Sequence, residues 1–282
     1  MKHSLFIVLI VIGLTTIISA QEQPRYTLIW SEEFDSEVLN DKIWSKIPRN
    51  QAEWAVNMTS HDSLYAFVDG NIVLRGVTNT FHPSDNSKLL TGGIWTKYKK
   101  NFGNGRLEIR AKFTESQGFW PAIWLLPQKS KSTPWPYAGE IDIMEHFQTA
   151  PYIDHTVHTY YTYHLHRTQQ PKSNAKVPYK KGEYNVYAVE KTDDSLIFFV
   201  NGERTFVYPR YRKGEEGQFP FSNQDYYLIL DAQLGASYMP VVDTTGFPAE
   251  LWIDYVRFYE MENQQATKKE SWLRKLFKSI FK

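Results

Sequence analysis

The feature that most constrains the fold is a succession of short β-branched and aromatic runs, each bounded by Gly, Pro, Asn or Asp. The expected strands are Tyr26–Ser31, Asn71–Val77, Arg106–Phe113, Ala122–Leu126, Glu140–Glu145, His155–Tyr163, Tyr184–Glu190 and Leu251–Tyr259. Long helical periodicity is missing between residues 26 and 260. So many short strands in 282 residues predict one all-β domain of two packed antiparallel sheets, a sandwich or jelly roll.

One turn is specified by the sequence itself. The apolar run from Leu196 to Val200 meets the run from Arg204 to Val207 across Asn201-Gly202. Because Asn and Gly tolerate positive φ angles, this pair predicts a tight hairpin turn.

The N-terminal end, residues 1–20, has the pattern of an export signal. Lys2 and His3 precede the apolar run from Leu5 to Ile18, and Ala20 offers a small residue for cleavage before Gln21. The run is short of the ~20 apolar residues that a membrane span needs. We therefore expect a secreted protein, periplasmic or extracellular, with an uncleaved membrane anchor as the alternative.

The C-terminal end changes in texture. Residues 21–260 are expected to form the domain, 261–270 a polar linker and 271–282 a basic amphipathic tail. On a helical wheel Trp272, Leu276 and Phe277 share one side, and Arg274 and Lys278 lie opposite. Such a helix either docks on the domain or lies on an anionic membrane surface, holding the protein at the cell surface.

Composition excludes several classes of function. A net charge of +1 gives no electrostatic reason to expect a nucleic-acid partner. The absence of Cys excludes disulfides, thiolate metal sites and a Cys nucleophile. Aromatics make up 16% of the chain, which suits either a bulky core or a sugar-binding surface. We expect a monomer.

The candidate chemistry is concentrated in the acidic run from Gly139 to His146. On a strand, Glu140 and Asp142 share one face because side chains alternate, and Glu145 falls on the other. One extra residue in a β-bulge restores the parity, and bulges often lie beside active sites. We therefore predict a bulge at Ile143-Met144 that brings all three acids to one face.

Three carboxylates on one face repel one another, which favours function over stability as their reason. Retaining glycosidases use such a pair, one carboxylate attacking the anomeric carbon and the other protonating the leaving oxygen. We expect Glu145 to titrate above Glu140, because an acid catalyst must hold its proton. A solvated strand face and a metal site with His146 or His158 are the alternatives.

Around this run the sequence resembles glycoside hydrolase family 16, in its laminarinase-like branch with a bulged active-site strand. The resemblance extends from about Tyr26 to Glu260. Its motifs are Trp30–Asp35, Val68–Leu74, Thr91–Ile94, Gly105–Lys112, Trp120–Leu126, the acidic run, Val157–Thr159, Tyr187–Glu190 and Asp254–Tyr259.

The resemblance implies a β-jelly roll with an open concave cleft, endo-action on a polysaccharide and retention of configuration. It implies Glu140 as nucleophile, Glu145 as acid/base and Asp142 as their assistant, with no cofactor for catalysis. The residues it implies for substrate binding are Trp120, Trp124, Trp135, His158, Gln233 and Tyr238. Core packing is the alternative for Trp124, and a plain sheet-end amide is the alternative for Gln233.

Some members of the family carry a structural calcium on the convex side. The matching positions here are Glu33, Gly70 through its carbonyl, and Asp254. Hard oxygen ligands suit calcium, although ordinary surface acids are the more frequent explanation for a few scattered oxygens.

Two sugar-binding positions depart from the family pattern. Tyr238 replaces a usual Trp, and Leu64 stands near where laminarinases carry an Asn. The segment from Tyr160 to Lys181 is long enough to reshape the cleft. We therefore expect a β-1,3- or mixed-linkage glucan first, and a β-galactose-containing mucin-type O-glycan or algal galactan second. A non-catalytic carbohydrate-binding jelly roll is the rival from another class, and intact acids argue against it.

Overall fold

The computed structural model describes residues 26–128, 133–211 and 215–262. The strands are β1 (Tyr26–Glu32), β2 (Ser45–Lys46), β3 (Tyr65–Val68), β4 (Asn71–Thr78), β5 (Leu89–Thr91), β6 (Gly93–Trp95), β7 (Gly105–Phe113), β8 (Phe119–Pro127), β9 (Glu140–Glu145), β10 (Ile153–His158), β11 (Asn174–Val177), β12 (Asn185–Lys191), β13 (Ser195–Val200), β14 (Glu203–Pro209), β15 (Tyr226–Leu234) and β16 (Ala249–Met261). The helical turns are η1 (Glu53–Ala55), η2 (Asp62–Leu64) and α1 (Tyr160–Tyr163).

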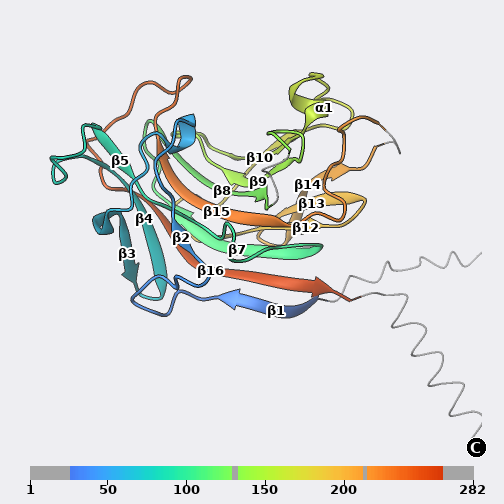
Figure 1. Cartoon of the computed structure of the whole chain (residues 1–282), viewed down its shortest axis with the longest axis horizontal. Coiled ribbons are helices and arrows are strands. Elements are labelled where there is room, and N and C mark those ends of the chain that lie inside the picture. The colour runs from blue at the N-terminus through green and yellow to red at the C-terminus, as the bar shows by residue number, and fades with distance from the viewer. Residues whose placement is uncertain (1–25, 129–132, 212–214, 263–282) are drawn as a thin grey trace, which may run out of the picture. The chain divides into compact units, whose positions relative to one another are not determined.

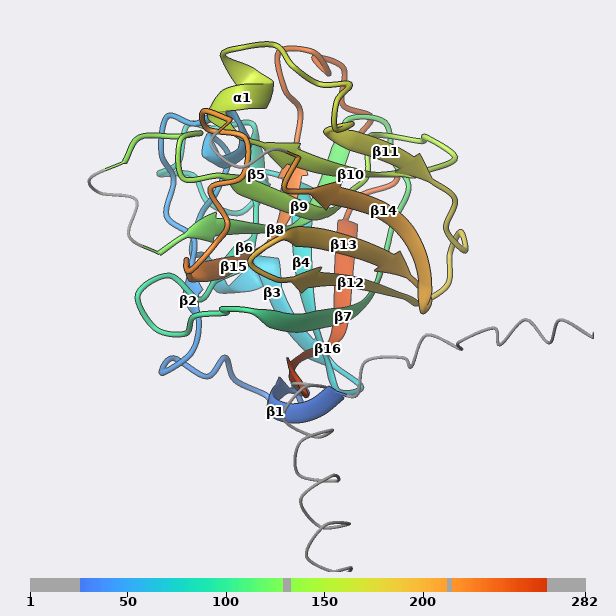
Figure 2. The same ribbon diagram turned by 90° about the vertical axis from the view of Figure 1, so that its right-hand side faces the viewer.

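These strands form two antiparallel sheets packed face to face, and the all-β jelly-roll sandwich is confirmed (Figures 1 and 2). The nine-stranded sheet has the order β14-β13-β12-β7-β16-β4-β3, with β1 added to β16 and β5 to β4. The seven-stranded sheet has the order β11-β10-β9-β8-β15-β6-β2. The strand β9, which carries the acidic run, is therefore an interior strand of the smaller sheet, paired with β10 and β8.

The core fills the space between the sheets, where alternate side chains of both meet. Leu74 and Ile109 reach it from the nine-stranded sheet, and Ile141, Ile143 and Leu230 reach it from the seven-stranded sheet. All five are fully buried. The remaining positions of β9 accordingly point to the opposite face of the seven-stranded sheet, here called the acid face.

Two local expectations have different outcomes. The Asn201-Gly202 hairpin is confirmed, with φ angles of 52° and 84°. The strand expected over His155–Tyr163 ends at His158, and residues 160–163 form one helical turn instead. Thr159 explains the change, because its hydroxyl accepts from the Thr162 amide and completes a capping box that starts the helix.

The domain boundary at the C-terminal end lies slightly beyond the expected one. Strand β16 continues to Met261, which pairs with Tyr26 and so does not belong to a linker. The export signal and the amphipathic tail lie outside the described residues and stay predictions. Among the helices that the structure describes, none is long and apolar enough to cross a membrane.

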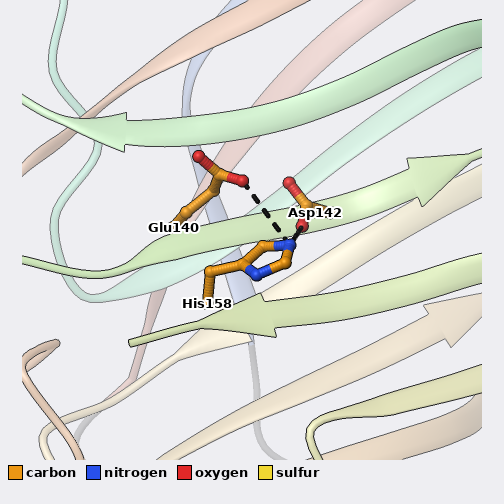
Figure 3. A group of neighbouring side chains, drawn as sticks. All are labelled: Glu140, Asp142 and His158. Carbon is orange, nitrogen blue, oxygen red and sulfur yellow. Dashed lines mark ion pairs between the residues drawn. The ribbon is translucent and has the colours of Figure 1, made fainter. Parts of the chain in front are cut away.

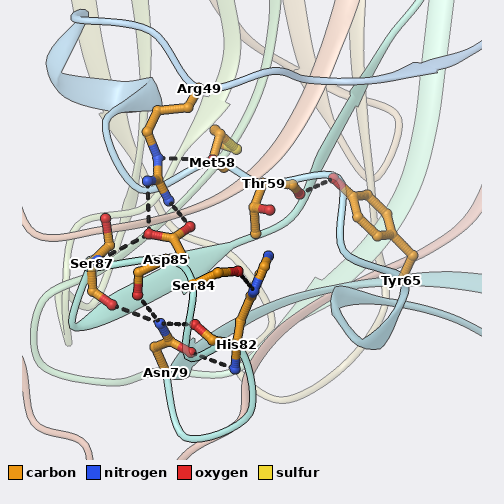
Figure 4. Close-up of polar contacts among 9 residues, drawn as sticks. All are labelled: Arg49, Met58, Thr59, Tyr65, Asn79, His82, Ser84, Asp85 and Ser87. Carbon is orange, nitrogen blue, oxygen red and sulfur yellow. Dashed lines mark hydrogen bonds and ion pairs between the residues drawn. The ribbon is translucent and has the colours of Figure 1, made fainter.

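A network of polar contacts holds the loop between β4 and β5 (Figure 4). The Asn79 amide donates to the carbonyls of His82, Asp85 and Ser87. Arg49 donates two hydrogen bonds to the Asp85 carboxylate and one to the Met58 carbonyl. Because Met58 is buried in the cluster that includes Trp124, this network ties the loop to the base of the acid face.

Candidate active site

The bulge predicted in β9 is present. Asp142 pairs with Trp124 on β8, while Met144 pairs with the preceding residue, Ile123, which leaves Ile143 as the extra residue. The register with β10 shifts at the same place. Ile143 and Met144 both enter the core, and Glu140, Asp142 and Glu145 consequently share the acid face.

Each outer carboxylate of this trio accepts a hydrogen bond from a tryptophan. The Trp135 indole nitrogen donates to Glu140 over 2.8 Å, and the Trp120 indole nitrogen donates to Glu145 over 3.0 Å. Both tryptophans were expected to contact sugar. Their indole N–H groups hold the two glutamates in place, the rings remain beside the carboxylates, and the sugar contacts stay a prediction.

His158, on β10, lies beside Glu140 and Asp142 (Figure 3). Its Nε2 atom is 3.4 Å from an Asp142 oxygen and 3.8 Å from a Glu140 oxygen. Burial lowers the pKa of His158 to about 4, so the ring is neutral at pH 7. The expected proximity of this histidine to the carboxylates is therefore present without a positive charge.

The electrostatics of the trio are those of crowded, desolvated acids. Burial raises the pKa values of Glu140, Asp142 and Glu145, and neighbouring negative charges raise all three further. Hydrogen bonds act in the opposite direction, because Trp135 lowers the pKa of Glu140 and Trp120 and Thr156 lower that of Glu145. Which of the two glutamates titrates at the higher pH stays a prediction.

A fourth carboxyl, not foreseen from the sequence, lies beneath the trio. Asp231 on β15 is fully buried and accepts from Trp124 over 3.3 Å and from Gln233 over 3.0 Å. Burial raises its pKa to about 8. Trp124 and Gln233 are themselves buried, so they act as the supports of Asp231 rather than as an exposed sugar-binding surface. The available signal was one acid within the otherwise apolar stretch Tyr226–Ala232.

Exposed rings border the trio on two sides. Tyr238 is 57% exposed and its ring lies 5.6 Å from that of Trp120, edge to face. Trp135 is 46% exposed and packs on Tyr163 at 4.5 Å. Rings that combine exposure with fixed neighbours are suited to packing against the C–H faces of sugars.

A cavity of about 510 Å³ opens beside His158. It is lined partly by the segment after β10, including Tyr163, His164 and His166. The segment that was expected to reshape the cleft thus contributes directly to the surface next to the acids.

The residues expected to bind calcium are engaged elsewhere. Arg257 donates two hydrogen bonds to Glu33, at 3.0 and 2.8 Å, and Arg110 donates to Asp254. Gly70 occupies a turn at φ 72°. Since guanidinium groups already neutralise both carboxylates, this arrangement does not fit the donor set of a calcium ion.

The described residues contain one other close group of metal-type ligands, Glu140, Asp142 and His158, whose ligand atoms lie within 4.8 Å of one another. The same geometry serves acid–base chemistry on a sugar. Catalysis by a carboxylate pair needs no metal ion.

Comparison with known proteins identifies the scaffold. Residues 56–197 match the model of the XgeA-like catalytic domain of glycoside hydrolase family 16. The chain is a member of glycoside hydrolase family 16. This family-16 chain carries an endo-acting glycoside hydrolase domain of a retaining family.

Two curated relatives have different activities. The enzyme is 34% identical to a keratan-sulfate endo-1,4-β-galactosidase of Sphingobacterium multivorum, over 84% of this chain and 56% of that protein. It is 31% identical to a β-glucanase of Rhodothermus marinus, over 92% of this chain and 94% of that protein. The chain thus spans about half the length of the first relative and nearly all of the second.

Similar solved structures also include a laminarinase and a structure described with O-glycanases. The laminarinase of Rhodothermus marinus superposes with a TM-score of 0.75 at 28% identity, covering 85% of this chain and 99% of that one. A structure described among the endo-acting O-glycanases that initiate mucin breakdown in the human gut microbiota superposes with a TM-score of 0.71 at 29% identity. It covers 84% of this chain and 100% of that one. The fold and the laminarinase-like resemblance are confirmed.

Proposed function

We propose that Glu140 attacks the anomeric carbon and that Glu145 protonates the leaving oxygen, then activates the water that releases the product. The observation that carries this proposal is the bulge at Ile143, which brings both glutamates to one face with Asp142 between them. Asp142, buried and next to His158, holds the nucleophile in place. A retaining mechanism needs the two carboxyl groups about 5–5.5 Å apart.

We further propose that the bond cleaved is β-galactosidic, in a galactose-containing glycan. The relative with 34% identity is a galactosidase, and the endo-acting O-glycanase structure has a similar identity. The two departures from the laminarinase pattern support the same choice. Tyr238 presents an exposed ring in place of a Trp, and Leu64 is fully buried, so it offers no polar contact to a sugar.

A β-1,3- or mixed-linkage glucan is the second candidate. It is favoured by the β-glucanase relative, which the chain covers almost from end to end. We propose secretion for either substrate, because a polysaccharide lies outside the cell and residues 1–20 have the pattern of an export signal.

A digestion panel separates the candidates. Keratan sulfate, a mucin O-glycan preparation, laminarin and lichenan are each incubated with the mature enzyme, and the products are sized over time. We expect a ladder of short oligosaccharides from keratan sulfate or the O-glycans. A ladder from laminarin and lichenan alone would transfer the assignment to glucans, and release of single sugars would contradict endo-action.

A further inference from the structure

His155 lies directly behind the bulge, on the core side of β10. Its neighbours Asp154 and Thr156 pair with Glu145 and Asp142, so His155 stands opposite the stretch that holds the extra residue. Its side chain is fully buried and packs on the Phe198 ring at 5.0 Å. The residue is therefore next to the bulge but has no access to substrate.

Both ring nitrogens of His155 have partners. Nδ1 is 2.6 Å from the carbonyl oxygen of Ile143, the extra residue. Because a carbonyl only accepts, Nδ1 carries the proton. Nε2 is 2.9 Å from the hydroxyl of Thr205, on β14 of the other sheet. Burial lowers the pKa of His155 to about 4, which keeps this tautomer neutral at pH 7.

These contacts give the extra residue of the bulge a hydrogen-bond partner that the strand ladder does not provide. An extra residue is left out of the strand ladder, and a buried carbonyl without a partner is costly. A strand that loses its bulge also shifts by one residue, which turns every following side chain to the opposite face. In β9 the side chain that would turn away is Glu145.

We propose that His155 is a positioning residue: it holds the bulge at Ile143 and thereby fixes the place of Glu145 relative to Glu140. The contact between Nδ1 and the Ile143 carbonyl carries this role, and the contact between Nε2 and the Thr205 hydroxyl does not. This inference rests on the proposed roles of Glu140 and Glu145.

Two isosteric substitutions separate the two ends of the ring. In His155→Asn the side-chain amide nitrogen takes the place of Nδ1 and keeps a donor for the Ile143 carbonyl. In His155→Gln the amide takes the place of Nε2 and keeps only the contact with Thr205. Thr205→Val is the matched control, since it removes only the contact with Nε2 and leaves the bulge contact in place.

Initial rates are measured on keratan sulfate and on laminarin, per folded enzyme and across pH. We expect His155→Gln to lower kcat about 10- to 100-fold with KM little changed, because a displacement near 1 Å has effects of that order. The basic limb of the pH profile of His155→Gln should also shift. The Asn and Val variants should remain within about threefold of wild type. Equal losses in the Asn and Gln variants, or an unchanged pH profile in the Gln variant, would overturn the proposal.

A second measurement needs neither substrate nor variant. Imidazole ¹⁵N spectra of the full chain should show His155 as the Nδ1–H tautomer from pH 5 to 8. An Nε2–H tautomer would break the contact with Ile143 and refute the positioning role, whatever glycan the enzyme cleaves. Absence of cleavage of both polysaccharides, together with the Nδ1–H tautomer, would count against the substrate proposal alone.

Discussion

The outer faces of the two sheets differ in whether their acidic side chains are paired with basic ones. On the nine-stranded sheet, Arg106 pairs with Glu108 and Glu190, and Arg75 pairs with Glu250. On the acid face, Glu140, Asp142, Glu145 and Asp231 are contacted by indole, imidazole and amide groups. Among the described residues no Lys or Arg forms an ion pair with these four. Paired charges serve the fold, whereas acids left without cations are kept protonatable for chemistry.

The largest expected effect comes from removing the nucleophile on the acid face. Glu140→Gln should lower kcat on the cleaved polysaccharide by on the order of 10⁴-fold or more, with binding retained, because the covalent step is lost. Glu250→Gln, the same change on the opposite sheet, should leave kcat unchanged. Early-time NMR of the wild-type products should show the β anomer. An α anomer would rule out retention.

The next effect separates the acid catalyst from the nucleophile. Glu145→Gln should lower kcat on the polysaccharide about 10²- to 10⁴-fold, the range of general acid catalysis. The leaving group of an activated aryl glycoside needs little protonation, so kcat on that substrate should fall much less. The basic limb of its pH profile should disappear or shift. A basic limb that stays in place would assign the proton donor to another residue.

An effect of intermediate size is expected on stability. Neutralising a buried acid should stabilise the protein on the acid face and destabilise it on the opposite sheet. The pKa of Asp231 is raised to about 8 from an ordinary value near 3.9, so the folded state binds the extra proton and stability falls as pH rises between these values. Asp231→Asn removes this penalty and should stabilise the fold by on the order of 1–3 kcal/mol at pH 7, with no gain below pH 4.

The matched change on the other face should destabilise. Glu190→Gln takes a charged partner from Arg106 and should cost about 1–3 kcal/mol at pH 7. Thermal unfolding at pH 4 and pH 7 measures both variants. Two changes of the same sign would show that the faces do not differ in the way described.

The smallest expected effect concerns calcium. Because Glu33 and Asp254 are each paired with an arginine, adding calcium chloride or a chelator should leave the unfolding temperature unchanged. If calcium raises the unfolding temperature of the wild type but not of Glu33→Gln, the result would support the predicted site.

Side-chain parity accounts for most of what the sequence could predict. It required a bulge to bring Glu145 to the face of Glu140, and it placed Trp120 and Trp124 together. Parity predicts which face of the sheet a side chain occupies but not how deeply it is buried. It therefore could not predict that Trp120 contacts Glu145 while Trp124 is buried against Asp231. Asp231 was missed because β15 is distant in sequence and becomes a neighbour only through β8. The helical turn at residues 160–163 depended on a cap at Thr159 that strand propensity does not register.

The two indole donors give this enzyme a built-in optical readout. Emission from an indole responds to the group that its N–H contacts, and Trp120 and Trp135 contact the two glutamates. A change in protonation of either carboxylate therefore changes the surroundings of one fluorophore directly. The half-exposed Trp135 also senses whatever settles beside it. The side chains that hold the acids in place can thus signal their charge state in unlabelled protein.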